Sequence, residues 1–354
     1  MSGAWHSFHG LRVGEIERLT DDAVAITLEV PPALAPVFRF EAGQHLNVRV
    51  PGGGDERRTY SVAASALTQR LRIGVRRLEG GAFSPYAVDA LTTGDILHVA
   101  PPAGAFVLHP RPDAARTVVA VAAGSGITPV LSILTTLLEA EPASRAVLIY
   151  GNRTTASVMF LDDLADLKDR WPGRFEVLHV LSREDRDARL LNGRITAERL
   201  RELLDAFVPP AAVDAWYVCG PQEMADGVRQ GLVAAGVPAD RVHSELFHVG
   251  DSAPPPIRRL APAAGVPVTI RLDGRSVHAV AGAEESLLEV ALRVRPDAPF
   301  ACRGGICGTC RARVSGEVET VRDFALEPEE RAAGLVLSCQ SYPVGGPVTV
   351  DYDV

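Results

Sequence analysis

Apolar and polar positions follow three successive patterns along the chain. In the first 110 residues, short stretches alternate between apolar and polar residues and end at Pro/Gly turns, with little helical periodicity. The clearest stretches are residues 23–29, 45–50, 71–76 and 96–100. A period of two is typical of strands that bury one face and expose the other. Residues 1–110 are therefore predicted to form a small antiparallel β-barrel.

From Thr117 onward, fully apolar strands alternate with amphipathic helices. Strands are predicted at residues 117–123, 146–150, 175–181 and 216–219, and helices at 130–139, 160–170 and 222–235. Buried parallel strands that alternate with helices are typical of a doubly wound α/β domain. We predict such a domain over residues 111–248.

The third pattern follows a segment rich in Pro and Ala. Residues 249–264 have no periodic apolar face and are predicted to be a linker, which the Pro255–Pro256 pair stiffens. Strands at 266–272, 276–280 and 347–351 and a helix near 286–293 then predict a compact ββαβ-type domain over residues 265–354. The chain is therefore expected to have three domains.

Composition narrows the class of protein. The chain of 354 residues is 47% hydrophobic and 23% charged, which is typical of soluble globular proteins. Its net charge of −8 argues against nucleic acid as a partner. The N-terminus lacks the features of a secretory signal, and the longest apolar stretches are far shorter than the roughly 20 residues that cross a membrane. We therefore expect a cytoplasmic protein that binds neither nucleic acid nor a membrane.

Four of the five cysteines carry the strongest chemical signal. Cys302, Cys307 and Cys310 follow the spacing C-x4-C-x2-C, and Cys339 lies further along the chain. This spacing is typical of plant-type [2Fe–2S] ferredoxins, and the intervening glycines let a loop wrap around a cluster. A four-thiolate zinc site is the alternative, although zinc sites favour paired C-x2-C motifs. Thiolate ligands of either kind indicate a reducing compartment.

A second motif stands at the end of a predicted barrel strand. Arg58-Thr59-Tyr60-Ser61 resembles the R-x-Y-S motif of the ferredoxin–NADP⁺ reductase superfamily. The resemblance implies that Arg58 pairs with a flavin pyrophosphate, that Tyr60 stacks on the isoalloxazine ring and that Ser61 hydrogen-bonds near its N5. An ordinary strand with a surface arginine is the alternative for four residues taken alone.

A further segment supports the flavin interpretation. Residues 80–84 read Gly-Gly-Ala-Phe-Ser and resemble the glycine–serine segment of the same superfamily, in which Gly81 and Ser84 would bind the pyrophosphate. Two motifs in the order of the superfamily are less easily explained as a chance match than one. FAD is the expected flavin, and no residue here distinguishes it from FMN.

The first α/β strand leads into a glycine turn. Gly124, Gly126, Thr128 and Pro129 match the G-x-G-x-T-P loop of the same superfamily. Pro129 departs from the strict dinucleotide-binding motif G-x-G-x-x-G, but it suits the first turn of a helix whose N-terminus could receive a phosphate. The resemblance places Thr128 near the nicotinamide.

A later strand ends in a further match. Cys219, Gly220, Pro221 and Met224 match the motif C-G-P-x-x-M of the superfamily, in which the cysteine faces the contact between nicotinamide and flavin. A buried structural thiol is the alternative for Cys219.

The end of the α/β domain holds two more candidates. Glu245 and Phe247 resemble a segment that lies over the flavin in some members of the superfamily. A helix-end carboxylate and a core phenylalanine would be equally ordinary. Cys219 and Glu245 are the candidate catalytic residues, although hydride transfer followed by single-electron transfer requires no acid–base residue.

Residues after the next two strands bear on the choice of nucleotide. A carboxylate there would bind the 2′-hydroxyl of NAD, and basic groups would bind the 2′-phosphate of NADP. This chain offers Arg153, Ser182 and Arg183. NADPH is therefore favoured, although Glu184 and Asp185 weaken the inference and leave NADH as the alternative.

The motifs occur in the order flavin, nicotinamide, cluster and span nearly the whole chain. In this order the chain resembles oxygenase reductases that end in a β-grasp ferredoxin domain. The run from Asp323 to Gln340 is most similar to reductase subunits of phenylacetyl-CoA epoxidases in aerobic phenylacetate degradation, with ketosteroid hydroxylase reductases next. The resemblance implies that electrons pass from NADPH through FAD and the cluster to a terminal oxygenase.

Two other functions stay open at the level of sequence. The first is a reductase of another oxygenase, such as a ketosteroid or ring-hydroxylating enzyme. The second is a non-enzymatic ferredoxin-type carrier whose N-terminal domains are structural, which predicts that the protein binds no flavin.

Overall fold

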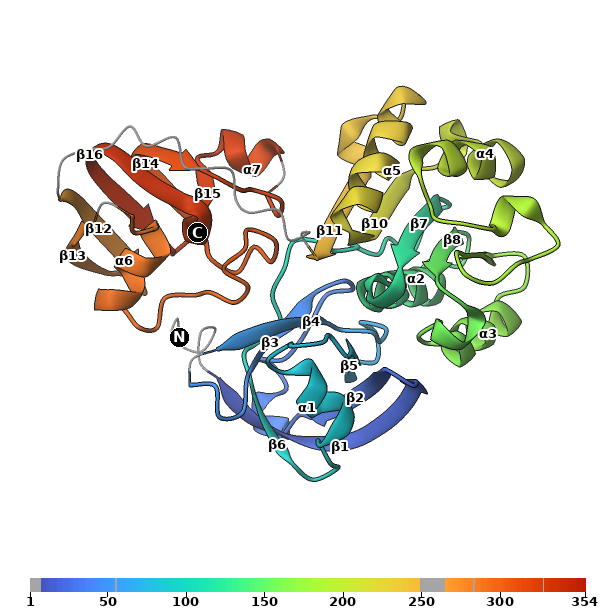
Figure 1. Ribbon diagram of the computed structural model, residues 1–354, viewed down its shortest axis with the longest axis horizontal. Coiled ribbons are helices and arrows are strands. Elements are labelled where there is room, and N and C mark those ends of the chain that lie inside the picture. Colours follow the sequence, from blue (N-terminus) through green and yellow to red (C-terminus); the bar gives the residue numbers. More distant parts are fainter. Residues whose placement is uncertain (1–7, 55, 249–264, 283, 327) are drawn as a thin grey trace.

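Three units, each built on one β-sheet, make up the molecule (Figure 1). The computed structural model describes residues 8–54, 56–248, 265–282, 284–326 and 328–354. The predicted linker at 249–264 lies outside these residues, and the boundaries of the predicted domains stay predictions. No helix in the described residues is long and apolar enough to span a membrane.

The first unit is a curled sheet of six strands in the order β4-β3-β6-β1-β2-β5, and every pair is antiparallel. The strands are β1 (His9–Thr20), β2 (Ala23–Glu29), β3 (His45–Arg49), β4 (Arg57–Ser61), β5 (Leu71–Arg76) and β6 (Ile96–Val99). A bridge between Val62 and Ile73 brings the two edge strands together. The predicted antiparallel barrel is confirmed.

Two elements of this unit were not predicted. Strand β1 pairs with β2 through register shifts after Val13 and after Arg18, so its apolar residues do not alternate regularly. Helix α1 (Ser84–Asp89) is too short for a helical period to show in the sequence.

The second unit is a parallel sheet in the order β11-β10-β7-β8-β9. Its strands are β7 (Thr117–Ala123), β8 (Arg145–Asn152), β9 (Phe175–Leu181), β10 (Ala215–Pro221) and β11 (Val242–His248). Its helices are α2 (Ile127–Ala140), α3 (Leu161–Arg170), α4 (Ala197–Phe207) and α5 (Gln222–Ala234). Helices α2 and α3 cover one face and α4 and α5 the other, which confirms the doubly wound fold (Figure 1).

The order of strands in this sheet reverses between β7 and β10. The chain leaves β7 towards β8 on one side and later returns to β10 on the other side. In open α/β sheets, ligands bind outside the carboxyl ends of the strands at such a reversal. The face that carries α2 and α3 also packs on the barrel, because its core includes Ala23, Ala25 and Ala42.

The third unit is a mixed sheet in the order β13-β12-β16-β14-β15 with helix α6 packed on it. Its strands are β12 (Val266–Leu272), β13 (Arg275–Ala281), β14 (Arg311–Thr320), β15 (Leu335–Leu337) and β16 (Ser341–Asp351), and its helices are α6 (Leu287–Val294) and α7 (Pro328–Ala332). A capping box at Ser286 begins α6. The Ser286 hydroxyl accepts a hydrogen bond from the Glu289 N–H at 3.3 Å, and the Glu289 carboxylate accepts one from the Ser286 N–H. This arrangement is the predicted β-grasp.

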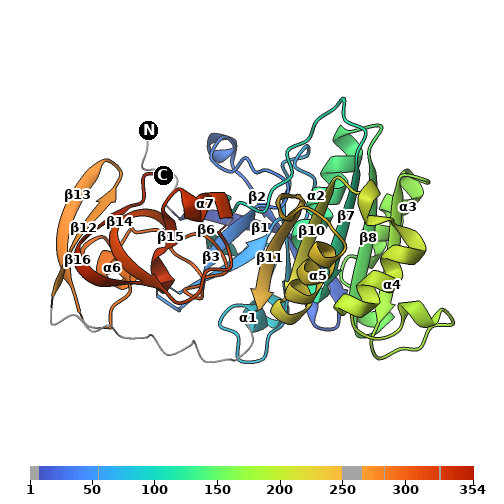
Figure 2. The same ribbon diagram turned by 90° about the horizontal axis from the view of Figure 1, so that it is seen from above.

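The third unit lies against both of the others (Figures 1 and 2). Ile306 and Phe324 pack on the core of the second unit. Asn47 and Arg57 of the first unit hydrogen-bond to Thr309 and to the Phe300 carbonyl. The loop between α6 and β14 therefore stands where the three units meet.

Candidate functional site

The four cysteines of the predicted cluster lie together as two pairs. Cys302 is hydrogen-bonded to Cys307, and Cys310 is hydrogen-bonded to Cys339. Cys302 is partly exposed, and the other three are buried. The hydrogen bond from Cys307 lowers the pKa of Cys302 to about 6, and the bond from Cys339 lowers the pKa of Cys310. The pKa values of the partners, Cys307 and Cys339, are raised, because each thiol shares its hydrogen with a neighbouring sulfur that ionises first. Two pairs of sulfurs, with one readily ionised thiol in each, suit two irons that are each held by two sulfurs.

The backbone of this loop fits a cluster. The Gly304 N–H donates to the Cys302 sulfur at 3.3 Å, and further N–H groups of the loop point to the same atom. Gly305 has φ +78°, and a Cβ there would stand 3.1 Å from the Arg322 carbonyl oxygen. Arg303 also has a positive φ, of 53°, and the Gln340 side chain holds its carbonyl at 2.8 Å. N–H groups that point to sulfur are a feature of iron–sulfur loops.

The residues of the R-x-Y-S motif lie on β4. Arg58 contacts the Glu56 carboxylate at 2.5 Å and its side chain is 41% exposed, so it can reach a ligand in solvent. Tyr60 packs beside Phe83, with 5.3 Å between the ring centroids. Because Phe83 belongs to the glycine–serine segment, the structure brings the two predicted flavin motifs together.

The glycine–serine segment forms a tight turn before α1. The buried Ser84 hydroxyl accepts from the Leu78 N–H at 3.0 Å. A Cβ at Gly81 would stand 2.7 Å from that hydroxyl. The small residue at position 81 therefore lets the backbone fold closely around Ser84, as a phosphate-binding turn requires.

Ser61 faces the second unit. Its hydroxyl donates to the Glu245 carboxylate at 3.2 Å, and the buried His45 Nδ1 lies 3.7 Å from the other carboxylate oxygen. The expectation that Glu245 could be a helix-end carboxylate is wrong, because it lies within strand β11 and pairs with Cys219 of β10. His45 was missed, since a single histidine in an alternating strand carries no signal of its own.

Cys219 is fully buried at the end of β10. Burial, and to a smaller extent Glu245, raises the pKa of its thiol, which is therefore neutral. Gly126 lies directly against it, because a Cβ at Gly126 would stand 2.2 Å from the Cys219 carbonyl oxygen. Thr128 is also buried and closes the turn by donating to the Ser125 carbonyl at 3.0 Å. Gly124, with φ +54°, starts the turn.

The rest of the C-G-P-x-x-M motif folds onto itself. A Cβ at Gly220 would meet the Met224 methyl at 2.7 Å, and Pro221 is the N-cap of α5. Phe247 of β11 is half-buried and packs on the core beneath α2 and α3. All these residues stand at the carboxyl edge of the parallel sheet, where a nucleotide is expected.

The candidate residues for the 2′-phosphate lie side by side. The Arg183 N–H donates to the Arg153 carbonyl at 2.8 Å, and Ser182 bonds the Asn152 carbonyl through its N–H at 3.0 Å. Both arginine side chains are exposed. Glu184 is engaged elsewhere, since Thr155 donates to its carboxylate through both the N–H and the hydroxyl at 2.7 Å, and this lowers its pKa.

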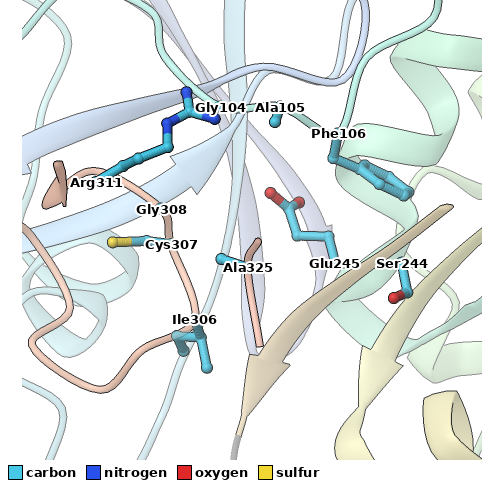
Figure 3. A pocket seen from close by; sticks show the side chains of 10 residues that line it. All are labelled: Gly104, Ala105, Phe106, Ser244, Glu245, Ile306, Cys307, Gly308, Arg311 and Ala325. Atoms are coloured by element: carbon cyan, nitrogen blue, oxygen red, sulfur yellow. The ribbon is translucent and has the colours of Figure 1, made fainter. Parts of the chain in front are cut away.

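A small cavity of about 30 Å³ marks the junction of the three units (Figure 3). It has room for one or two water molecules and none for a nucleotide. The Glu245 carboxylate points into it across from the loop that carries Cys307, whose sulfur points away from Glu245. Its lining residues are Gly104, Ala105, Phe106, Ser244, Glu245, Ile306, Cys307, Gly308, Arg311 and Ala325. Glu245, which Ser61 of the R-x-Y-S motif contacts, and the cluster loop thus meet at this cavity.

Family models match all three units. Residues 10–108 match an oxidoreductase FAD-binding domain, residues 120–230 an oxidoreductase NAD-binding domain and residues 270–344 a 2Fe-2S iron-sulfur cluster binding domain. The chain is 42% identical to a component of the 1,2-phenylacetyl-CoA epoxidase of Escherichia coli K12, over 98% of each chain. The chain belongs to the family of flavin- and iron–sulfur-dependent oxygenase reductases.

Two more comparisons support membership of this oxygenase reductase family. The ferredoxin reductase component of 3-ketosteroid-9-alpha-monooxygenase from Rhodococcus rhodochrous is 33% identical over 97% of this chain and 96% of its own. The solved structure of phthalate dioxygenase reductase is similar with a TM-score of 0.61 and 28% identity, over 97% of this chain and 98% of that one.

The family decides several of the sequence-based alternatives. FAD, a pyridine nucleotide and a [2Fe–2S] cluster are the cofactors, and the protein is an electron-transfer oxidoreductase that serves a terminal oxygenase. The zinc site and the carrier with purely structural N-terminal domains are therefore wrong. The roles of individual residues stay predictions.

Proposed function

We propose that this oxygenase reductase takes electrons from NADPH and delivers them singly to a terminal oxygenase that epoxidises phenylacetyl-CoA. The observation that carries the proposal is 42% identity to the Escherichia coli epoxidase component over nearly the whole of both chains, against 33–35% for the ketosteroid reductase components. The thiolate-rich loop supports a location in the reducing cytoplasm.

The structure supports a role for each candidate residue. Arg58, Gly81 and Ser84 would hold the FAD diphosphate, and Tyr60 would support the ring. Ser61, Glu245 and Phe247 would stand near the site of hydride transfer. The glycine turn at 124–126, Thr128 and the segment 219–224 would orient the nicotinamide, and the four cysteines would hold the cluster.

These groups supply complementary chemistry when bound: FAD accepts a hydride and releases its electrons one at a time, and the cluster carries single electrons. The side chains of the protein orient these groups and determine which charges stand beside them. The neutral Cys219 thiol places no charge at the carboxyl edge. The hydrogen bond from Ser61 fixes the Glu245 carboxylate beside it.

Reconstitution tests the partner. With a purified oxygenase that epoxidises phenylacetyl-CoA, we expect NADPH consumption to match epoxide formation. With the oxygenase component of a ketosteroid hydroxylase, we expect NADPH consumption without product. Equal coupling to both oxygenases would contradict the assignment of the partner.

The choice of NADPH is tested at the paired arginines. We expect Arg153→Gln combined with Arg183→Gln to raise the KM for NADPH by about tenfold, because two charge-assisted contacts to the 2′-phosphate are lost. The KM for NADH should change by less than about twofold, since NADH lacks that phosphate. The matched control is Arg145→Gln, because Arg145 is an exposed arginine at the opposite end of β8. An equal rise in both KM values would contradict the assignment.

A further inference from the structure

A buried arginine joins the first unit to the third. Arg57 opens β4 immediately before the R-x-Y-S motif and is only 7% exposed. Its Nη1 donates to the Phe300 carbonyl at 3.1 Å, and its guanidinium carbon lies 3.8 Å from the centroid of the Phe300 ring. The Phe8 ring also contacts this guanidinium, at 5.0 Å. Arg57 therefore holds Phe300 through both its backbone and its ring.

Phe300 is part of the core that surrounds the cluster ligands. It is 3% exposed and packs in one apolar group with Cys310, Cys339 and Leu337. It stands two residues before Cys302 in the chain. A residue that fixes Phe300 thus also fixes the cluster loop relative to the barrel.

A second contact reaches the same loop. The Thr59 hydroxyl donates to the Asn47 side chain at 3.0 Å, and the Asn47 amide donates to the Thr309 hydroxyl at 3.4 Å. Thr309 lies between Cys307 and Cys310. Because side chains alternate along a strand, Arg57 and Thr59 lie on one side of β4 and Tyr60 lies on the Phe83 side. Arg57 contacts the third unit directly, and Thr59 reaches it through Asn47. One strand therefore serves both the flavin motif and the contact with the cluster loop.

The chemistry of Arg57 favours a role in docking. Removing a guanidinium from water is costly unless charge-assisted hydrogen bonds and aromatic faces replace its hydration. Phe8 of the first unit provides one of these aromatic faces, and the third unit adds a carbonyl and a second ring, so part of the replacement depends on that unit being in place. The energy of the contact is gained on docking and lost when the ferredoxin unit leaves.

We propose that Arg57 is a positioning residue that docks the chain's own ferredoxin unit against the flavin unit, with the Cys307 loop facing the Glu245 cavity. One electron then passes from reduced flavin to oxidised cluster without any bond being made or broken. The docking depends on the electron-transfer function of the family and not on which oxygenase is the partner.

The test uses the full-length holoenzyme with Arg57→Met. We expect flavin reduction by NADPH, and ferricyanide reduction, to stay within about twofold of the parent, because Arg57 contacts the third unit. Cluster reduction, followed by stopped-flow absorbance per loaded cluster, should be about tenfold slower, because the docked form is less populated. Small-angle X-ray scattering should show a larger radius of gyration.

Three further variants make the result specific. Arg57→Lys keeps the charge but lacks the planar fork, so it should lie between the parent and Arg57→Met in both measurements. Asn47→Ala should slow cluster reduction in the same direction but less. Arg77→Met is the matched control, because Arg77 is an exposed arginine of the same unit that pairs with Asp89. It should change neither measurement.

Two outcomes would overturn the docking role. Unchanged cluster reduction in Arg57→Met would show that the contact is not needed. Slower cluster reduction with an unchanged radius of gyration would place Arg57 in the electron path and not in docking. If Arg57→Met is purified without flavin, the Arg57→Lys and Asn47→Ala variants decide by the same two measurements.

Discussion

Cys307→Ser is expected to leave flavin reduction by NADPH intact and to abolish most of the NADPH-dependent reduction of cytochrome c. Cys307 is buried and hydrogen-bonded to Cys302, so it completes one of the two thiol pairs. A serine hydroxyl is a poor replacement for a soft thiolate ligand, and we expect a fall of about a hundredfold in cytochrome c reduction. Stopped-flow flavin reduction and steady-state cytochrome c reduction, measured on the same preparation, check the prediction.

Cys219→Ser is the control for that variant, because it is expected to affect flavin reduction and to leave the cluster intact. Cys219 is also buried, but it lies in the second unit at the carboxyl edge of the parallel sheet. We expect this variant to keep the visible absorbance of the cluster and to slow flavin reduction instead. If Cys307→Ser lost flavin reduction and cytochrome c reduction to the same extent, electrons would not leave through the cluster.

The site residues could be predicted from the sequence where a motif forms one continuous turn. The cysteine loop, the glycine turn at 124–126 and the segment 219–224 each fold on themselves, so their spacing alone shows what they build. Strands were harder to predict where register shifts interrupt the alternation of apolar and polar residues, as in β1. Contacts between distant residues leave no such pattern.

The residues that sequence reasoning missed all act across units. His45 approaches Glu245, which lies 200 residues further along the chain, and Arg57 reaches Phe300 in another sheet. Gly74 of β5 is a third example, since a Cβ there would stand 2.5 Å from the Thr128 methyl of the second unit. Each of these pairs is defined by the packing of whole units, which a motif of a few residues cannot encode.

Gly126→Ala is expected to be the most damaging change in the nicotinamide region. The added Cβ would stand 2.2 Å from the carbonyl oxygen and 2.6 Å from the carbonyl carbon of Cys219, and backbone atoms cannot rotate away as a side chain can. Either α2 or the end of β10 must move. Overpacking of this kind costs about 1–3 kcal/mol of stability. A displacement of about 1 Å lowers a rate by about a hundredfold, so hydride transfer from NADPH should fall to that extent.

The control is the same substitution at Gly227, in the same unit. Gly227 lies within α5, and a Cβ there would stand 3.6 Å from its nearest neighbour, the Ala197 nitrogen, which is an ordinary contact. Alanine in a helix interior is favoured over glycine by up to about 1 kcal/mol, so Gly227→Ala should raise the melting temperature slightly and leave flavin reduction unchanged. Since both variants add one methyl group, a hundredfold difference between them in flavin reduction can only come from the position of that group. Equal rates would show that the turn at 124–126 does not need its contact with Cys219 to orient the nucleotide.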